Sequence, residues 1–131
     1  MTSRKLAQTI AQLASDKKAE DIVVLDMRQI VNFCDFFVIC SGNTDRQVRA
    51  ITGYFDEKLS EWGYRVRHGR ASRQGDWAVI DMGDVVAHVF QKQIREFYRL
   101  EYLWREAKPV VWDKKSLKRR SLSGTESSEN R

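Results

Sequence analysis

The chain has 131 residues, 42% of them hydrophobic and 31% charged, which is typical of one soluble domain with its own core. Its net charge of +5 is concentrated in residues 114–131, where six Lys or Arg and two Glu give +4, so that residues 1–113 carry only +1. This distribution argues against a folded body that binds nucleic acid, and no apolar run is long enough to span a membrane.

The two cysteines indicate a reducing compartment. Cys34 and Cys40 lie six residues apart in one apolar segment, so on a single strand they would share a face and lie too far apart for a disulfide. The chain has no CxxC pair, and its N-terminus has no apolar signal core. We therefore expect a cytoplasmic protein, with earlier removal of an organelle-targeting segment left open.

The first half of the chain predicts a helix, two strands and a second helix. Ser3 is the expected cap of a helix with a narrow apolar stripe. That stripe comprises Leu6, Ala7, Ile10, Ala11, Leu13 and Ala14. Residues 21–26 and 35–40 are predicted strands, the second apolar throughout and therefore buried on both faces. Thr44 and Gln47 match a capping box for the second helix. Its predicted buried residues are Val48, Ile51, Tyr54 or Phe55, and Leu59.

The second half predicts three more strands and a third helix. Residues 64–68 are an expected edge strand, and residues 69–75 a polar loop. Residues 77–82 and 85–90 form a hairpin around a two-residue turn. A helix follows, which Pro109 helps to end. The predicted fold class is α/β, with a single mixed β-sheet of about five strands, helices packed against it and the order α-β-β-α-β-β-β-α. We expect one domain over residues 1–113 and a basic, Ser-rich disordered tail over residues 114–131.

The two faces of the predicted hairpin differ in character. One is entirely apolar and is predicted core, comprising Ala78, Ile80, Met82, Val85, Ala87 and Val89. The other mixes aromatic, aliphatic and ionisable residues, namely Trp77, Val79, Asp81, Val86, His88 and Phe90. The helix after the hairpin is also apolar around most of its circumference. Such surplus aromatic surface indicates a protein partner, but a second helical layer over the mixed face explains it as well.

The residues for catalysis or metal binding are sparse. His68 and His88 are the two histidines, too few for a closed zinc site, and His88 is placed diagonally to Asp81 for a hydrogen bond. We therefore predict no metal and no cofactor. The Gly42–Gln47 loop joins a strand to a helix N-terminus, where phosphate can bind, but it lacks a Walker lysine and a G-x-G-x-x-G motif. A small nucleotide-binding or nucleotidyltransferase-type enzyme using this loop is the alternative to a non-enzymatic protein.

Four segments resemble the ribosomal silencing factor, or Iojap, family. They are DIVVLDM (21–27), CDFFVICSGNTDRQVRAI (34–51), DWAVIDMGDVVAHVF (76–90) and REFYRLEYLW (95–104). The resemblance extends from about Leu6 to Ala107. It implies a nucleotidyltransferase-like topology without the catalytic signature of that fold, in agreement with the absence of converging carboxylates in the sequence.

The resemblance also implies a function and a binding site. Family members bind the large ribosomal subunit through large-subunit ribosomal protein fourteen and sterically block joining with the small subunit, which represses translation under nutrient limitation. The expected partner-binding residues are Trp77, Val79, Asp81, His88, Phe90, Arg95, Tyr98, Leu100, Glu101 and Trp104. Among them, Trp77 and Tyr98 are the expected anchors. Arg95 and Glu101 are expected either at the rim or as intramolecular braces.

Some features depart from the resemblance or lie outside it. His68 and Gln93 stand where the family usually or often has an acidic residue, so negative charge is lost at both positions. The basic tail either contacts ribosomal RNA or only keeps the chain soluble. Family members often form dimers when free, and the mixed hairpin face can serve that association too. No membrane partner is expected.

Overall fold

The computed structural model describes residues 1–70, 77–98, 102 and 104–113. Its helices and strands follow one another in the order α1 (Ser3–Asp16), β1 (Glu20–Asp26), β2 (Phe36–Gly42), α2 (Asp45–Glu61), β3 (Arg67–Arg70), β4 (Trp77–Asp81), β5 (Val85–Gln91), α3 (Lys92–Tyr98) and β6 (Lys108–Val110). The strands form a single mixed sheet in the order β3-β4-β5-β2-β1-β6. The predicted α/β class and element order are confirmed, with one additional strand at the end.

The centre of the sheet is the parallel pair β2 and β5. Phe36 lies opposite Val85 and Gly42 opposite Gln91, while every other strand pair is antiparallel. All seven residues of β2 are buried, and so are all residues of β5 except Gln91. Burial on both faces explains the unbroken apolar runs of these two strands.

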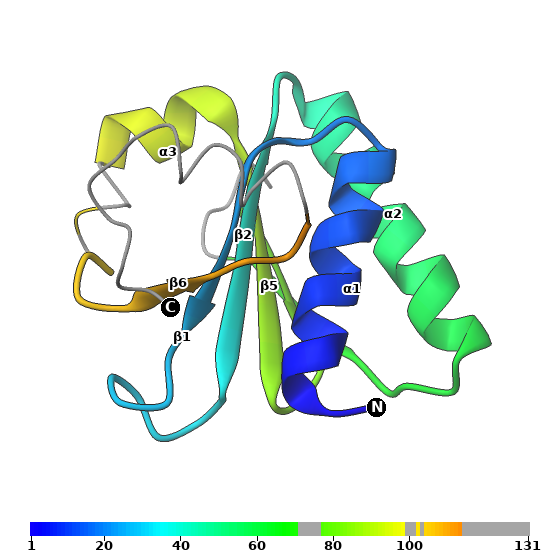
Figure 1. Cartoon of the computed structure of the whole chain (residues 1–131). Helices are drawn as coiled ribbons and strands as arrows, with labels where there is room; N and C mark the ends of the chain where they lie inside the picture. Colours follow the sequence, from blue (N-terminus) through cyan, green and yellow to red (C-terminus); the bar gives the residue numbers. More distant parts are fainter. Residues whose placement is uncertain (71–76, 99–101, 103, 114–131) are drawn as a thin grey trace.

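Helices cover the two faces of this sheet unequally. Figure 1 shows α1 and α2 side by side on one face and the short α3 on the other. The first face holds the larger apolar cluster, which includes the whole predicted stripe of α1 and, from α2, the residues Val48, Ile51, Phe55 and Leu59. A smaller cluster lies on the other face and is built from Met27, Cys34, Phe37, Ile39, Val86, Phe90 and Ala107.

The long helices begin and end at specific side chains. Thr2, one residue before the predicted cap, accepts a hydrogen bond from the Lys5 amide at 3.1 Å. Thr44 accepts one from the Gln47 amide at 3.1 Å, and the Gln47 side chain accepts one from the Asn43 amide at 2.8 Å. The predicted capping box is therefore present, with its second hydrogen bond one residue earlier than in the usual motif.

The edge strands differ from the prediction for local reasons. The Tyr64 amide donates to the Leu59 carbonyl at 2.9 Å and so still belongs to the end of α2. This delays β3 to residues 67–70, where Gly69 pairs with Val79. The sequence reading missed β6, because its central residue is Pro109. Proline cannot donate to a ladder, but it is tolerated on an edge strand such as β6.

The prediction that Cys34 and Cys40 share a face is wrong. Cys34 precedes β2 and belongs to the smaller cluster, whereas Cys40 lies within β2 and faces α1 and α2. Cys34 lies two residues before β2 begins, and side-chain alternation does not extend into the loop. Both cysteines are free thiols.

Glycine at position 42 is required by the contact between β2 and α2. A Cβ atom there would lie 3.0 Å from the Val48 amide nitrogen, whereas a Cβ on Gly53 of α2 would meet nothing within 4 Å. We expect Gly42→Ala to lower the free energy of unfolding by about 1–3 kcal/mol through overpacking. Gly53→Ala, the control, should raise it by about 0.5–1 kcal/mol. Urea unfolding measures both, and equal effects would contradict this explanation.

Candidate protein-binding face

The hairpin has the register predicted for it. Trp77 lies opposite Phe90, Val79 opposite His88 and Asp81 opposite Val86. This register places the mixed face of the hairpin on the same side of the sheet as the smaller cluster and α3. The second layer that would explain the aromatic surplus therefore exists in part, because α3 and the segment after it cover some of this face.

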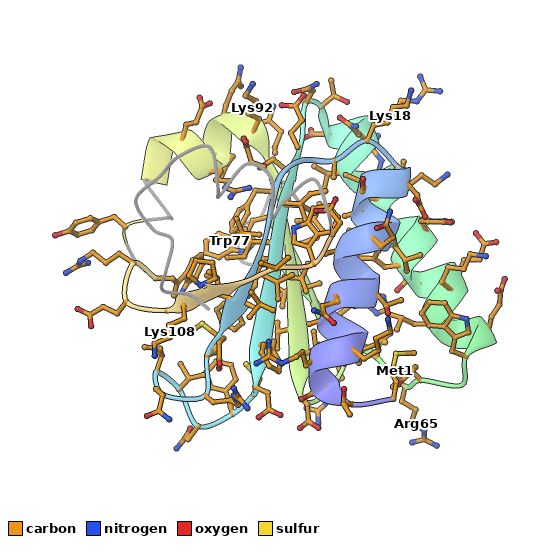
Figure 2. The ribbon with its side chains drawn as sticks, in the orientation of Figure 1. Met1, Lys18, Arg65, Trp77, Lys92 and Lys108 are labelled. Atoms are coloured by element: carbon orange, nitrogen blue, oxygen red, sulfur yellow. The ribbon has the colours of Figure 1, made fainter. Side chains whose placement is uncertain are left out.

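Five rings form what we call the aromatic face: Phe37, Trp77, His88, Phe90 and Trp104. They come from β2, β4, β5 and the segment before β6. The His88 ring lies 4.5 Å from that of Phe37 and 5.6 Å from that of Trp104, measured between centroids. The Trp77 ring lies 4.6 Å from that of Phe90. Figure 2 shows Trp77 on the side of the sheet away from α1.

Burial divides the ten predicted partner-binding residues. Phe90 is fully buried, and His88 and Arg95 are only 8% and 5% exposed, so these three lie inside the chain. Four others are half-buried and can be reached from outside: Trp77, Val79, Asp81 and Trp104. The side chains of the remaining three, Tyr98, Leu100 and Glu101, lie outside the described part of the chain. Contact with a partner stays a prediction for all ten residues.

A mainly apolar groove of about 170 Å³ adjoins the aromatic face. It is lined by Val23, Leu25, Ile39, Arg95, Trp104, Arg105 and Ala107. Sequence reasoning missed the two β1 residues, Val23 and Leu25, which lie opposite Ile39 and Phe37 of β2. Side chains alternate along β1, so Val23 and Leu25 are expected on one face of the strand. Only the pairing with β2 shows which face of the sheet this is.

His88 is a neutral, buried member of this face. Its Nδ1 accepts a hydrogen bond from the Trp77 indole at 3.2 Å, so its proton sits on Nε2, which has no hydrogen-bond partner among the described residues. Desolvation by burial lowers the pKa of His88 to about 4. The hydrogen bond expected between His88 and Asp81 is absent, because the Asp81 carboxylate instead accepts from the Gly83 amide at 2.8 Å within the turn.

Arg95 fixes α3 to the sheet. Its guanidinium donates to the Asp21 carbonyl at 2.7 Å and to the Ser41 hydroxyl at 2.9 Å, and the side chain is buried. Of the two roles expected for this residue, the geometry matches the intramolecular brace. Ser41 itself is fully buried at the end of β2, so this contact also satisfies its hydroxyl oxygen.

The groups that could support catalysis are engaged or inert. Burial raises the pKa of Cys34 to about 11 and that of Cys40 to about 12, so neither thiol is a ready nucleophile. At the start of α2, the Asn43 and Gln47 amides are occupied by side chains of the loop itself. Within the described ranges, no three potential metal ligands converge. No helix in those ranges is long and apolar enough to cross a membrane.

These features define an α/β fold with a single mixed sheet and a half-buried aromatic face of the kind that binds protein partners. A family model described as "Ribosomal silencing factor during starvation" matches residues 1–131. The chain belongs to this ribosomal silencing factor family, whose members are ribosome-binding regulators and not enzymes.

Similar proteins agree with the family match. A ribosomal silencing factor from Halalkalibacterium halodurans is 41% identical over 110 residues, covering 84% of this chain and 94% of that protein. The chloroplastic Iojap protein of Zea mays is 35% identical over 104 residues, covering 79% of this chain and 45% of the maize protein. A crystal structure of a Chromobacterium violaceum protein is similar with a TM-score of 0.74 at 29% identity, covering 87% of this chain and 98% of that one.

The brace role of Arg95 can be tested by its effect on stability. Arg95→Met leaves the Asp21 carbonyl and the Ser41 hydroxyl without this donor, so we expect the free energy of unfolding to fall by about 2–3 kcal/mol. Arg105→Met is the control, because Arg105 lines the same groove but is exposed. Its effect should stay within about 0.5 kcal/mol in urea unfolding. Equal stability of the two variants would contradict the brace.

The buried neutral state of His88 predicts a loss of stability in mild acid. Its pKa is about 4 in the folded chain and 6.5 ordinarily, so as the pH falls the unfolded chain binds the proton first. Above pH 6.5 His88 is neutral in both the folded and the unfolded chain, so it does not lower the free energy of unfolding. Between pH 6.5 and 4 that free energy falls, by about 2 kcal/mol at pH 5. Urea unfolding near neutrality and near pH 5 measures this loss. His88→Phe should abolish most of it, and an unchanged pH dependence in that variant would exclude His88 as the cause.

Proposed function

We propose that this chain binds the large ribosomal subunit through large-subunit ribosomal protein fourteen and sterically prevents the small subunit from joining. Translation would thereby be repressed under nutrient limitation, in the cytoplasm. The observation that carries the proposal is the half-covered aromatic face in a chain of the ribosomal silencing factor family. A domain that acts by steric blocking needs a docking surface and no catalytic group, and this matches the residues described above.

The aromatic face has the composition of a protein-binding hot spot. Two tryptophans, Trp77 and Trp104, are half-buried on either side of His88. The apolar groove beside Trp104 can receive an apolar side chain of the partner. The exposed Arg105 and the half-buried Asp81 provide polar groups near its edge. Because burial keeps His88 neutral, docking does not have to desolvate a charge there.

The face is also held in shape before binding. The Trp77 indole is oriented by its hydrogen bond to His88, and the Trp104 ring stands at 90° to that of Phe37 at a centroid distance of 5.4 Å. Side chains that are already ordered lose little conformational entropy when a partner binds. The brace from Arg95 to the end of β2 and the start of β1 contributes to the same order.

We propose two further partners. A second copy of the chain can cover the same aromatic face when no ribosome is present, which light scattering would detect.

The basic tail can contact ribosomal RNA through its phosphates. Just before the tail, the Val111 carbonyl accepts a hydrogen bond from the Gln8 side chain of α1 at 2.8 Å, and Trp112 packs against the larger cluster. These last described residues therefore lie on the side of the sheet opposite the aromatic face.

The enzymatic alternative has lost its main support. Phosphate binding at Gly42–Gln47 would use backbone amides of this loop, and two of them, those of Asn43 and Gln47, already donate to side chains of the loop itself. The Gln47 side chain also bonds the Lys18 carbonyl at 3.1 Å, so the loop joins the end of α1 to the start of α2. Its arrangement is that of a structural junction.

Co-sedimentation with isolated ribosomal subunits tests the proposed function. The wild type should bind the large subunit and not the small one, and Trp77→Ala should weaken that binding by about 2 kcal/mol or more. Trp104→Ala, at the other end of the aromatic face, should also weaken it. Trp62→Ala is the matched control, because Trp62 caps the far end of α2 and is 40% exposed.

Circular dichroism and urea unfolding of each variant separate lost binding from lost folding. Failure of the folded wild type to bind either subunit would contradict the function itself. Equal weakening by Trp62→Ala and Trp77→Ala would contradict only the location of the binding face.

A further inference from the structure

The loop between β1 and β2 presents apolar side chains to solvent. Ile30 is 43% exposed and Phe33 is 64% exposed, and both come from this one loop. Isolated exposed apolar residues are common on soluble proteins, whereas two on one short loop mark a candidate contact site. The loop lies at the end of the sheet, between β1 and β2 (Figure 1).

Backbone hydrogen bonds hold this loop in one shape. The amide of Met27, a fully buried residue, donates to the Asp35 carbonyl at 2.8 Å and closes the loop at its base. The Met27 carbonyl accepts from the Ile30 and Val31 amides at 3.0 Å each. The Asp35 amide in turn donates to the Asp84 carbonyl of the hairpin turn at 2.7 Å. Phe33 is thus presented on an ordered support, which favours binding.

The loop is continuous with the aromatic face. The Phe33 ring lies 6.3 Å from that of Phe37, which itself contacts the rings of His88 and Trp104. Val31 also packs against the smaller cluster beneath this face. A partner seated on Trp77 and Trp104 can therefore extend along the same side of the sheet to reach Phe33.

A polar pocket of about 250 Å³ lies beside Phe33 and carries negative charge. Its lining includes Asp35 and Asp84, whereas the one cation in it, Arg28, is paired with Asp26 through two bonds of 2.9 and 2.7 Å. The negative charge also affects the neighbouring thiol. Burial is the main cause that raises the pKa of Cys34, and the charges of Asp35, Asp81 and Asp84 raise it further. Such a pocket attracts a cationic side chain and repels nucleic-acid phosphates.

We propose that Phe33 and the Asp35–Asp84 pocket form a second contact with the ribosomal protein that binds the aromatic face, and that this pocket receives an arginine or lysine of that protein. Phe33 packs against the partner's apolar surface and the stem of the basic side chain, while the two carboxylates bind its charged end. This inference rests on the proposed function and adds the chemistry that a second part of the partner must offer. The expected occupant of the pocket is a basic side chain of a protein, and not RNA.

Quantitative binding of two variants to isolated large subunits tests the second contact. Phe33→Ser removes an exposed ring and should weaken binding about tenfold without changing the unfolding midpoint. Asp84→Lys reverses an exposed charge of the pocket, and its defect should be largest at low salt and shrink as salt is added. Trp62→Ser is the control for loss of an exposed aromatic ring elsewhere and should bind as the wild type does.

The outcomes separate this inference from the proposed function. If the wild type binds and Trp77→Ala does not, but Phe33→Ser and Asp84→Lys both bind normally, then the second contact is wrong and the function stands. If the wild type itself does not bind, the function fails first.

Photocrosslinking identifies the occupant. With p-benzoylphenylalanine in place of Phe33, irradiation of the complex should crosslink the chain to a ribosomal protein. A crosslink to ribosomal RNA, or none in a complex that still forms, would overturn the proposal.

Discussion

The parallel pairing of β2 with β5 at the centre of the sheet determines where the other elements must pack. Two adjacent central strands that are buried on both faces require a covering layer on each side. On one side, α1 and α2 supply 31 residues of helix and a continuous apolar layer. On the other side, the described cover is the seven-residue α3 and the segment from Trp104 to Ala107. The aromatic face lies on this second side, where Trp77 and Trp104 are half-buried.

Polar groups are also buried on this second side. Arg95 reaches from α3 to the end of β2 and the start of β1. His88 remains neutral and orients Trp77. Both residues stabilise or orient the face from inside, and the half-buried tryptophans provide the surface that a partner can contact. Under the proposed function, one side of the sheet holds the larger apolar cluster and the other side binds the partner.

Much of this arrangement was predictable from local sequence patterns. The Gly83-Asp84 turn together with strict alternation fixed the hairpin register, and the spacing of leucine, isoleucine and alanine fixed the buried side of α1. β6 was not predictable, because Pro109 opposes strand formation locally and only the pairing with β1 accommodates it. The prediction could not divide the ten candidate residues into buried and reachable ones either. Phe90 and Trp77 are both aromatic, but their burial depends on elements far away in the sequence.

The positions that the sequence reading missed share one cause. Val23, Leu25 and Phe33 belong to the candidate surface only because β1 pairs with β2 and places the intervening loop beside the aromatic face. A single-sequence pattern gives the alternation of a strand but not the identity of its neighbours. Long-range pairing therefore accounts for both the missed strand and the missed part of the site.

Hydroxyl-radical footprinting of the free chain and of its complex with large ribosomal subunits shows which side of the sheet the ribosome covers. Oxidation reports the solvent exposure of individual aromatic side chains, and Trp62 on the helical side serves as an internal reference. The account predicts that oxidation of Trp77 and Trp104 falls in the complex while that of Trp62 is unchanged. Protection of Trp62 with Trp77 and Trp104 still oxidised would contradict it, because the chain would then bind through its helices.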